Sequence, residues 1–180
     1  LRSVEIPDTV EEISKEAFSY CVGLEKIVLK NVKEIGEAAF EGCTGLESIE
    51  ILGKIQTLGP WCFRRCANLH NVRIEGVGFN YDTQRPAPFF DCSNIVSVVV
   101  SPKDAFGYPG VMPHSDMKIQ DLEVVEGVTN VTLVCGPGLK RLVLPATMEA
   151  FSAPVYNNPN LGEIIVSAEN PRFAAKDGIL

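Results

Sequence analysis

The sequence predicts an α/β-class solenoid in which one short strand from each repeat stacks on the next to form a parallel sheet. Two observations predict it: a repeat and an apolar alternation inside the repeat. Six positions recur with the same chemistry in three consecutive units: Leu1, Val4, Ile6, Ile13, Phe18 and Cys21; Leu24, Ile27, Leu29, Ile35, Phe40 and Cys43; Leu46, Ile49, Ile51, Leu58, Phe63 and Cys66. The units start at residues 1, 24, 46 and 69, so the period is 22 to 23 residues. A fixed period of this length indicates a solenoid.

The first half of each unit carries the strand. Its apolar residues alternate at the fourth and sixth positions, which places both on one side of an extended chain. Strands that run in the same direction from unit to unit form a parallel sheet with a spacing of about 4.8 Å. The sequence therefore predicts one strand per unit, with the fourth and sixth side chains in the core.

The second half of each unit returns the chain to the next strand. Residues 35–43 are too few for a stable helix, so we expect a turn of 3₁₀ or α character around Ala38 to Phe40. The recurring Phe of each unit then stacks on the Phe of the next. The fold is mostly strand, turn and 3₁₀ conformation, with little regular helix.

The whole chain, 1–180, is expected to form a single domain of about eight units, and two of these depart from the pattern. The units start near residues 1, 24, 46, 69, 95, 119, 139 and 161. A Pro-rich loop, 76–88, lengthens the fourth unit before Phe90 and Cys92, and the fifth unit loses the pattern over 101–118. Both ends of the chain fall within a repeat, so we expect a piece of a longer protein.

Composition excludes several classes of partner. The formal net charge of −7 and the scattered Lys and Arg residues argue against a nucleic-acid surface. The longest apolar run, Ile95 to Val100, is far shorter than the roughly 18 residues of a membrane span, so no membrane insertion is expected in this segment.

A column of cysteines follows from the repeat. Cys21, Cys43, Cys66 and Cys92 share one repeat position. Stacked units bring these cysteines within disulfide distance, but parallel side chains do not give the converging Cβ vectors that a disulfide needs. We therefore interpret the column as small buried thiols, with a disulfide as the alternative.

The repeat resembles the BspA-type leucine-rich repeat, whose pattern is L-x-x-I-x-I-P-x-x-V-x-x-I-G-x-x-A-F-x-x-C. The stretches IPDTVEEISKEAFSYCVGLEKI and KNVKEIGEAAFEGCTGLESI carry it most fully. The resemblance implies a right-handed leucine-rich-repeat solenoid. It also implies a bacterial protein that is secreted or displayed at the cell surface, often an adhesin.

No catalytic or metal-binding constellation stands out. The chain has only two histidines, His70 and His114, and it lacks a nucleophile elbow, a phosphate loop and an H-E-x-x-H pair. The sequence therefore predicts no enzyme activity in this segment, no cofactor, no metal site and no catalytic residue.

The outward side of the predicted sheet is the first candidate for binding. Its candidate residues combine apolar and charged side chains: Arg73, Val96, Val99, Glu123, Arg141, Val143 and Ile165. Exposed apolar patches often mark interaction sites, although the segment 101–118 could equally cover this one. The second candidate is the pair of irregular loops, with the aromatic anchors Phe79, Tyr81, Phe106 and Tyr108.

These observations predict a noncatalytic interaction or adhesion module that is extracellular or on a bacterial cell surface. Its partner would be a protein or glycan on a host or neighbouring cell, and the module is expected to be a monomer. Two alternatives remain open: a structural spacer that displays other domains, and an accessory module of an exported enzyme.

Overall fold

The computed structural model describes residues 2–53, 55–74, 88–100, 119–127, 129–132, 138–152 and 159–174. The four expected loop anchors, Phe79, Tyr81, Phe106 and Tyr108, lie outside the described residues, as does the segment 101–118.

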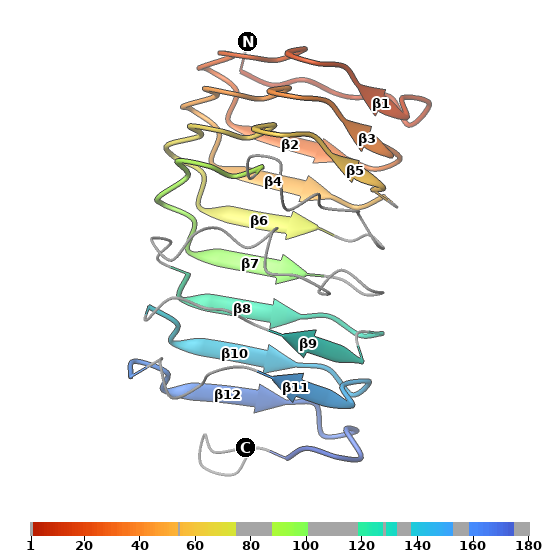
Figure 1. Ribbon diagram of the computed structural model, residues 1–180, viewed down its shortest axis with the longest axis vertical. Coiled ribbons are helices and arrows are strands. Elements are labelled where there is room, and N and C mark those ends of the chain that lie inside the picture. Colours follow the sequence, from red (N-terminus) through yellow and green to blue (C-terminus); the bar gives the residue numbers. More distant parts are fainter. Residues whose placement is uncertain are drawn as a thin grey trace.

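One seven-stranded parallel sheet runs the length of the molecule (Figure 1). Each strand is one turn of the chain beyond the last, and the order in the sheet follows the sequence order. The strands are β2 (Lys26–Leu29), β4 (Ser48–Ile51), β6 (Asn71–Ile74), β7 (Ser97–Val100), β8 (Asp121–Val124), β10 (Arg141–Leu144) and β12 (Glu163–Val166). The described residues contain no helix, and so none that could cross a membrane. The expected solenoid of stacked parallel strands is confirmed.

Five further short strands line the return half of the coils. Three of them, β1 (Glu12–Ile13), β3 (Glu34–Ile35) and β5 (Thr57–Leu58), form a second parallel sheet, and β9 (Asn130–Thr132) pairs with β11 (Ala150–Ser152). The sequence predicts one strand per unit, so these five strands are additional to the prediction. Their signal was the recurring apolar residue in the middle of the unit, because that side chain is buried at Ile13, Ile35 and Leu58.

The return segment is a series of turns rather than a 3₁₀ or α-helical turn. Ala39 N donates to Gly36 O at 3.3 Å, and Glu41 N donates to Ala38 O at 3.0 Å. Ala38, however, has a φ of 53°. A residue in the left-handed region breaks a right-handed helix, so the helical character expected around Ala38 to Phe40 does not develop.

A column of stacked phenylalanines fills the return side of the core. The ring centroids of Phe18 and Phe40 are 5.1 Å apart, those of Phe40 and Phe63 are 5.2 Å apart, and those of Phe63 and Phe89 are 5.1 Å apart. The stacking is as expected, but the fourth member is Phe89 and not Phe90. Phe90 is 38% exposed. The three-residue step from Phe to Cys, as in Phe40 and Cys43, puts Phe89 in register with Cys92.

The cysteine column lies beside the phenylalanines and consists of free thiols in the described part of the chain. Each thiol donates to a Phe carbonyl of the preceding coil: Cys43 Sγ to Phe18 O at 3.1 Å, Cys66 Sγ to Phe40 O at 3.3 Å, and Cys92 Sγ to Phe63 O at 2.9 Å. Burial raises the pKa of Cys43 to about 11. The Cys43 thiol therefore stays neutral near pH 7. The thiols of Cys43, Cys66 and Cys92 join neighbouring coils as weak hydrogen-bond donors.

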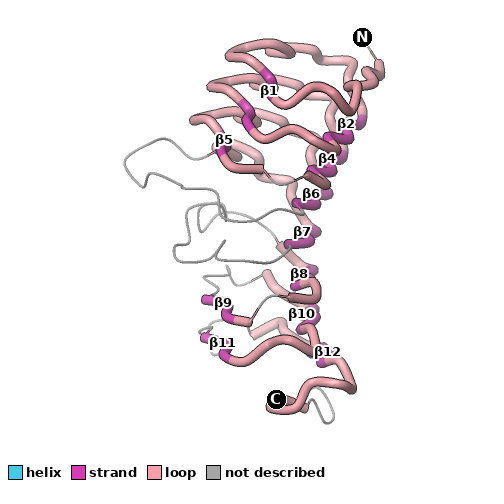
Figure 2. The backbone as a smooth tube through the Cα atoms, turned by 90° about the vertical axis from the view of Figure 1, so that its right-hand side faces the viewer, coloured by secondary structure: helices cyan, strands magenta, loops and turns pink. Residues whose placement is uncertain are grey.

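The alternation along each strand divides the main sheet into a core side and an outer side. Ile27 and Leu29 of β2 are buried, as are Ile49 and Ile51 of β4, whereas the residues between them are partly exposed. Figure 2 shows the sheet along one side of the molecule, with its outer side curved gently inward. The outer face of the sheet, defined as the outward side chains of these seven strands, is thus a regular and accessible surface.

Candidate functional site

The outer face consists of two rows of side chains that cross all seven strands. The strand register aligns the first row as Lys26, Ser48, Asn71, Ser97, Asp121, Arg141 and Glu163. The second row, two residues further along each strand, is Val28, Glu50, Arg73, Val99, Glu123, Val143 and Ile165. Members of one row are direct neighbours in the sheet, so their side chains can act on one ligand.

A rim row lies just before the strands and is held in the same register by the backbone. From its second member onward, each residue donates its N–H to the carbonyl of the previous member: His70 N to Glu47 O at 2.9 Å and Val96 N to His70 O at 3.0 Å are examples. The row comprises Glu25, Glu47, His70, Val96, Gln120, Lys140 and Gly162. The two rows of the outer face and the adjoining rim row together form a grid with seven columns and three rows.

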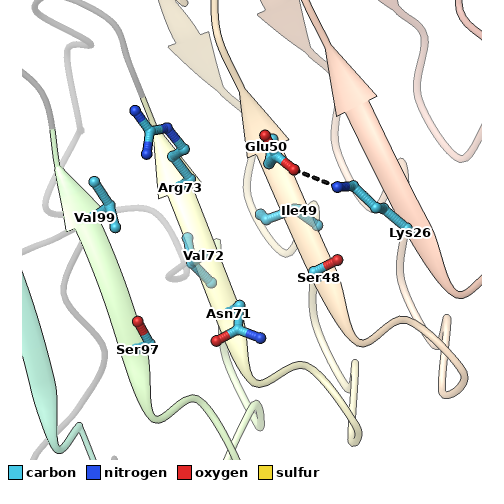
Figure 3. Close-up of a pocket in the computed structure, with 9 residues that line it drawn as sticks. All are labelled: Lys26, Ser48, Ile49, Glu50, Asn71, Val72, Arg73, Ser97 and Val99. Atoms are coloured by element: carbon cyan, nitrogen blue, oxygen red, sulfur yellow. Dashed lines mark ion pairs between the residues drawn. The ribbon is translucent and has the colours of Figure 1, made fainter.

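A groove of about 390 Å³ hollows the outer face over β2, β4, β6 and β7. It is lined by Lys26, Ser48, Ile49, Glu50, Asn71, Val72, Arg73, Ser97 and Val99. Figure 3 shows the short polar side chains of Ser48, Asn71 and Ser97 along one side of the groove, with Arg73 and Val99 along the other. The groove offers hydroxyl, amide and guanidinium groups beside a branched apolar side chain.

Two ion pairs and one hydrogen bond fix several of the long side chains on the outer face and its rim. Lys26 pairs with Glu50 across β2 and β4 (Figure 3). Further along, Arg141 Nε lies 3.1 Å from Glu163 Oε2, and Lys140 Nζ donates to Gln120 Oε1 at 2.8 Å. These groups are substantially solvated, so each pair stabilises the fold by less than about 1 kcal/mol. Their effect is to hold charges at defined places on the surface.

The structure brings some of the predicted binding residues together and separates others. Arg73 and Val99 line the groove, and Val96 lies on the rim beside it. Glu123, Arg141, Val143 and Ile165 continue the rows towards the C-terminal end and do not line the groove. Among them, Ile165 is 37% exposed.

The sequence analysis missed the first-row residues that line the groove, Ser48, Asn71 and Ser97. Their signal was present, because they occupy the same repeat position on the outward side of each strand. Short polar side chains are common on solvent-facing strands, so their residue type alone does not distinguish a binding surface.

The described residues hold no group of three or more His, Cys, Asp and Glu side chains that could bind a metal. His70 is exposed on the rim, whereas Cys43, Cys62, Cys66 and Cys92 are buried inside the coils. Burial also raises the pKa of Cys62 well above its ordinary value. A buried neutral thiol is a poor nucleophile, so Cys62 has the character of a core-packing residue.

A second polar cluster lies on the turn side, outside the outer face. The Arg64 guanidinium carbon is 5.1 Å from the centre of the Trp61 ring and 5.8 Å from that of Phe90, and Arg64 Nη1 is 3.3 Å from Glu41 Oε1. Two rings and a carboxylate enclose this arginine. The cluster therefore links neighbouring coils, and its charge is already compensated.

The chain was compared with solved structures and with curated proteins. The solved structures include a similar chain, a leucine rich cell surface protein from Faecalibacterium prausnitzii A2-165, with 19% sequence identity and a TM-score of 0.38. The match covers 92% of the present chain and 60% of that one, so the present chain spans 60% of its length. No curated protein matches the chain.

The family comparison covers more than half of the sequence. A model of the BspA type leucine rich repeat region matches residues 1–107 in six copies. The matched part includes the Phe and Cys columns and strands β2, β4, β6 and β7. The chain belongs to the BspA-type leucine-rich repeat family.

Proposed function

We propose that the chain is a noncatalytic interaction module of an extracellular or cell-surface bacterial protein, and that it binds a protein or glycan through the outer face. The observation that carries the proposal is the groove of about 390 Å³ over β2, β4, β6 and β7. Its volume falls within the roughly 300–1,000 Å³ of pockets that receive ligands. Membership of a repeat family that is expected at bacterial surfaces supports the location.

The chemistry of the outer face suits a protein partner in particular. Charged side chains of both signs alternate along the rows, as in Glu50, Arg73 and Glu123, and such patterns select partners by electrostatic complementarity. Arginine is also enriched among the residues that dominate protein interfaces. Val99, Val143 and Ile165 add apolar surface between the charges.

The two irregular loops remain a second proposed contact region. Phe79, Tyr81, Phe106 and Tyr108 are their aromatic side chains, and loops on a regular scaffold frequently carry recognition. The outer face is the primary proposal because its geometry is defined strand by strand.

The proposal can be tested by blocking the groove. The chain is immobilised and exposed to a panel of purified extracellular-matrix proteins and surface glycans, and binding is followed by interferometry. Ser97→Arg places a long side chain in the groove, and we expect it to weaken binding at least about tenfold, equivalent to about 1.4 kcal/mol. Glu12→Arg introduces the same side chain on β1, away from the outer face, and should leave binding unchanged. Absence of any ligand, or equal binding by both variants, contradicts the proposal.

A further inference from the structure

We infer that the outer face is self-complementary and pairs face to face with the outer face of a second copy of this chain. The inference goes beyond the proposed function, because it requires no external partner. It rests on the order of charges along the three rows of the grid, read outward from β7 in both directions. β7 is the central strand of the seven-stranded sheet.

The geometry of such a pair is fixed by symmetry. A two-fold axis parallel to β7 turns one sheet over onto the other and reverses the order of its strands, while each row still faces the same row. A two-fold interface is isologous, so every contact occurs twice. With the axis over β7, strand β6 faces β8 of the second copy, β4 faces β10, and β2 faces β12.

This register brings opposite charges together in all three rows. In the second row, Arg73 faces Glu123 of the second copy. In the first row, Lys26 faces Glu163. On the rim, Glu47 faces Lys140. No like charges meet, and opposite potentials across an interface favour that register over others.

The uncharged residues agree with the same register. Val28 faces Ile165 of the second copy near the two ends of the interface. Asn71 faces Asp121, which allows its amide to donate to a carboxylate. One contact is unfavourable, because Glu50 faces Val143, but Glu50 retains its own ion pair with Lys26.

Neighbouring registers are electrostatically worse. Moving the axis to β6 places Arg73 on Arg73, and moving it to β8 places Glu123 on Glu123. Placing it between β6 and β7 sets Glu50 against Glu123 and Lys26 against Arg141. Placing it between β7 and β8 brings no opposite charges together. Only the register centred on β7 combines the three attractive pairs with no repulsive one, and it also covers all seven strands.

The size and curvature of the outer face predict a weak association. Seven strands about 4.8 Å apart, with about five residues of 3.3 Å each, give an area of about 500 Å² per copy. The total of about 1,000 Å² is below the 1,200–2,000 Å² of stable complexes. Because the outer face is gently concave (Figure 2), its two ends meet first, and the long side chains of Arg73 and Glu123 bridge the middle.

A second copy would also cover the groove, so self-association and partner binding exclude one another.

Analytical ultracentrifugation of the chain and of charge-reversal variants tests the inference. We expect the unmodified chain to shift from monomer towards dimer between about 10 μM and about 1 mM. Arg73→Glu and Glu123→Arg should each weaken the dimer at least about tenfold, because each places two like-charged pairs across the axis. Glu12→Arg on β1 is the matched control and should change nothing.

Mixing the two single variants gives the sharpest result. One copy then presents Glu at both 73 and 123, and the other presents Arg at both, so both facing pairs become attractive. We expect the equimolar mixture to recover a heterodimer that neither variant forms alone. The pair Lys26→Glu and Glu163→Lys should behave in the same way if either first variant fails to fold.

A chain that stays monomeric to about 1 mM overturns the inference, as does a dimer that Arg73→Glu leaves intact or a mixture that does not recover. Because the readout is self-association alone, these outcomes leave the matrix-binding test of the proposed function unaffected.

Discussion

Removing the ring of Phe40 should destabilise the coils more than any exposed aromatic substitution. Phe40 is fully buried and its ring stacks on two others, with centroid distances of 5.1 Å to Phe18 and 5.2 Å to Phe63. Phe→Ala substitutions in protein cores cost about 3–5 kcal/mol. Each stacked pair adds about 0.5–1.5 kcal/mol beyond burial, and Phe40→Ala breaks two of them. We therefore expect a loss near the upper end, about 4–5 kcal/mol.

Urea denaturation and thermal melting followed by circular dichroism measure this loss. For a chain of this length about 4 kcal/mol corresponds to a fall in melting temperature of roughly 8–16 °C. Phe90→Ala is the matched control, because Phe90 is 38% exposed and lies outside the stack. It should cost about 1 kcal/mol or less. If Phe40→Ala destabilised the chain no more than Phe90→Ala did, the stacked column would not be a main source of stability.

Three further predictions follow from the packing between coils. A Cβ at Gly59 would lie 2.6 Å from Glu37 N, so Gly59→Ala should lower the free energy of unfolding by about 2 kcal/mol in a urea titration. A Cβ at Gly162 would have nothing within 4 Å, so Gly162→Ala is the control and should be neutral or slightly stabilising. Burial raises the pKa of Cys43 from 9.0 to about 11, so the thiol ionises in the unfolded state at a lower pH than in the folded state. The free energy of unfolding should therefore fall as the pH rises from 9.0 to about 11. Cys43→Ala should reduce that fall, and an unchanged pH profile would contradict this expectation. Arg64→Met should lower the free energy of unfolding by about 1 kcal/mol in thermal melts. The methionine keeps the apolar contact between Trp61 and Phe90, but the cation–π contacts and the ion pair with Glu41 are lost. A variant more stable than the unmodified chain would refute this role of Arg64.

The repeat made most of the fold predictable. Because the period fixes which residues share a position, the strands of the main sheet, the register of Arg73 beside Val99, and the columns of Phe and Cys could all be inferred before any coordinates. The buried positions of the strands followed from simple alternation. These are consequences of periodicity, which a single sequence reveals directly.

What the sequence left open depends on local backbone conformation and on short side chains. The φ of 53° at Ala38 replaces helical character by successive turns, and nothing in Ala-Ala-Phe specifies that conformation. Phe89 and Phe90 are chemically identical, and only the spacing to Cys92 decides which ring is stacked. The groove was not foreseen because Ser48 and Asn71 carry no distinctive signal in isolation.

The charges of the outer face illustrate the same division between sequence and structure. Each charged residue is visible in the sequence, but the pairing of Lys26 with Glu50 and the symmetry about β7 depend on the register between strands. Complementarity is a property of the assembled grid. It becomes apparent only when the rows are aligned.

Site-specific photocrosslinking shows whether partners contact the outer face. A benzophenone amino acid is placed at Asn71 in the groove, or at Glu12 on β1 as the control, and each variant is irradiated with a ligand from the matrix panel. We expect a crosslinked complex from position 71 and none from position 12. Crosslinking from position 12 alone, or equally from both, would contradict it.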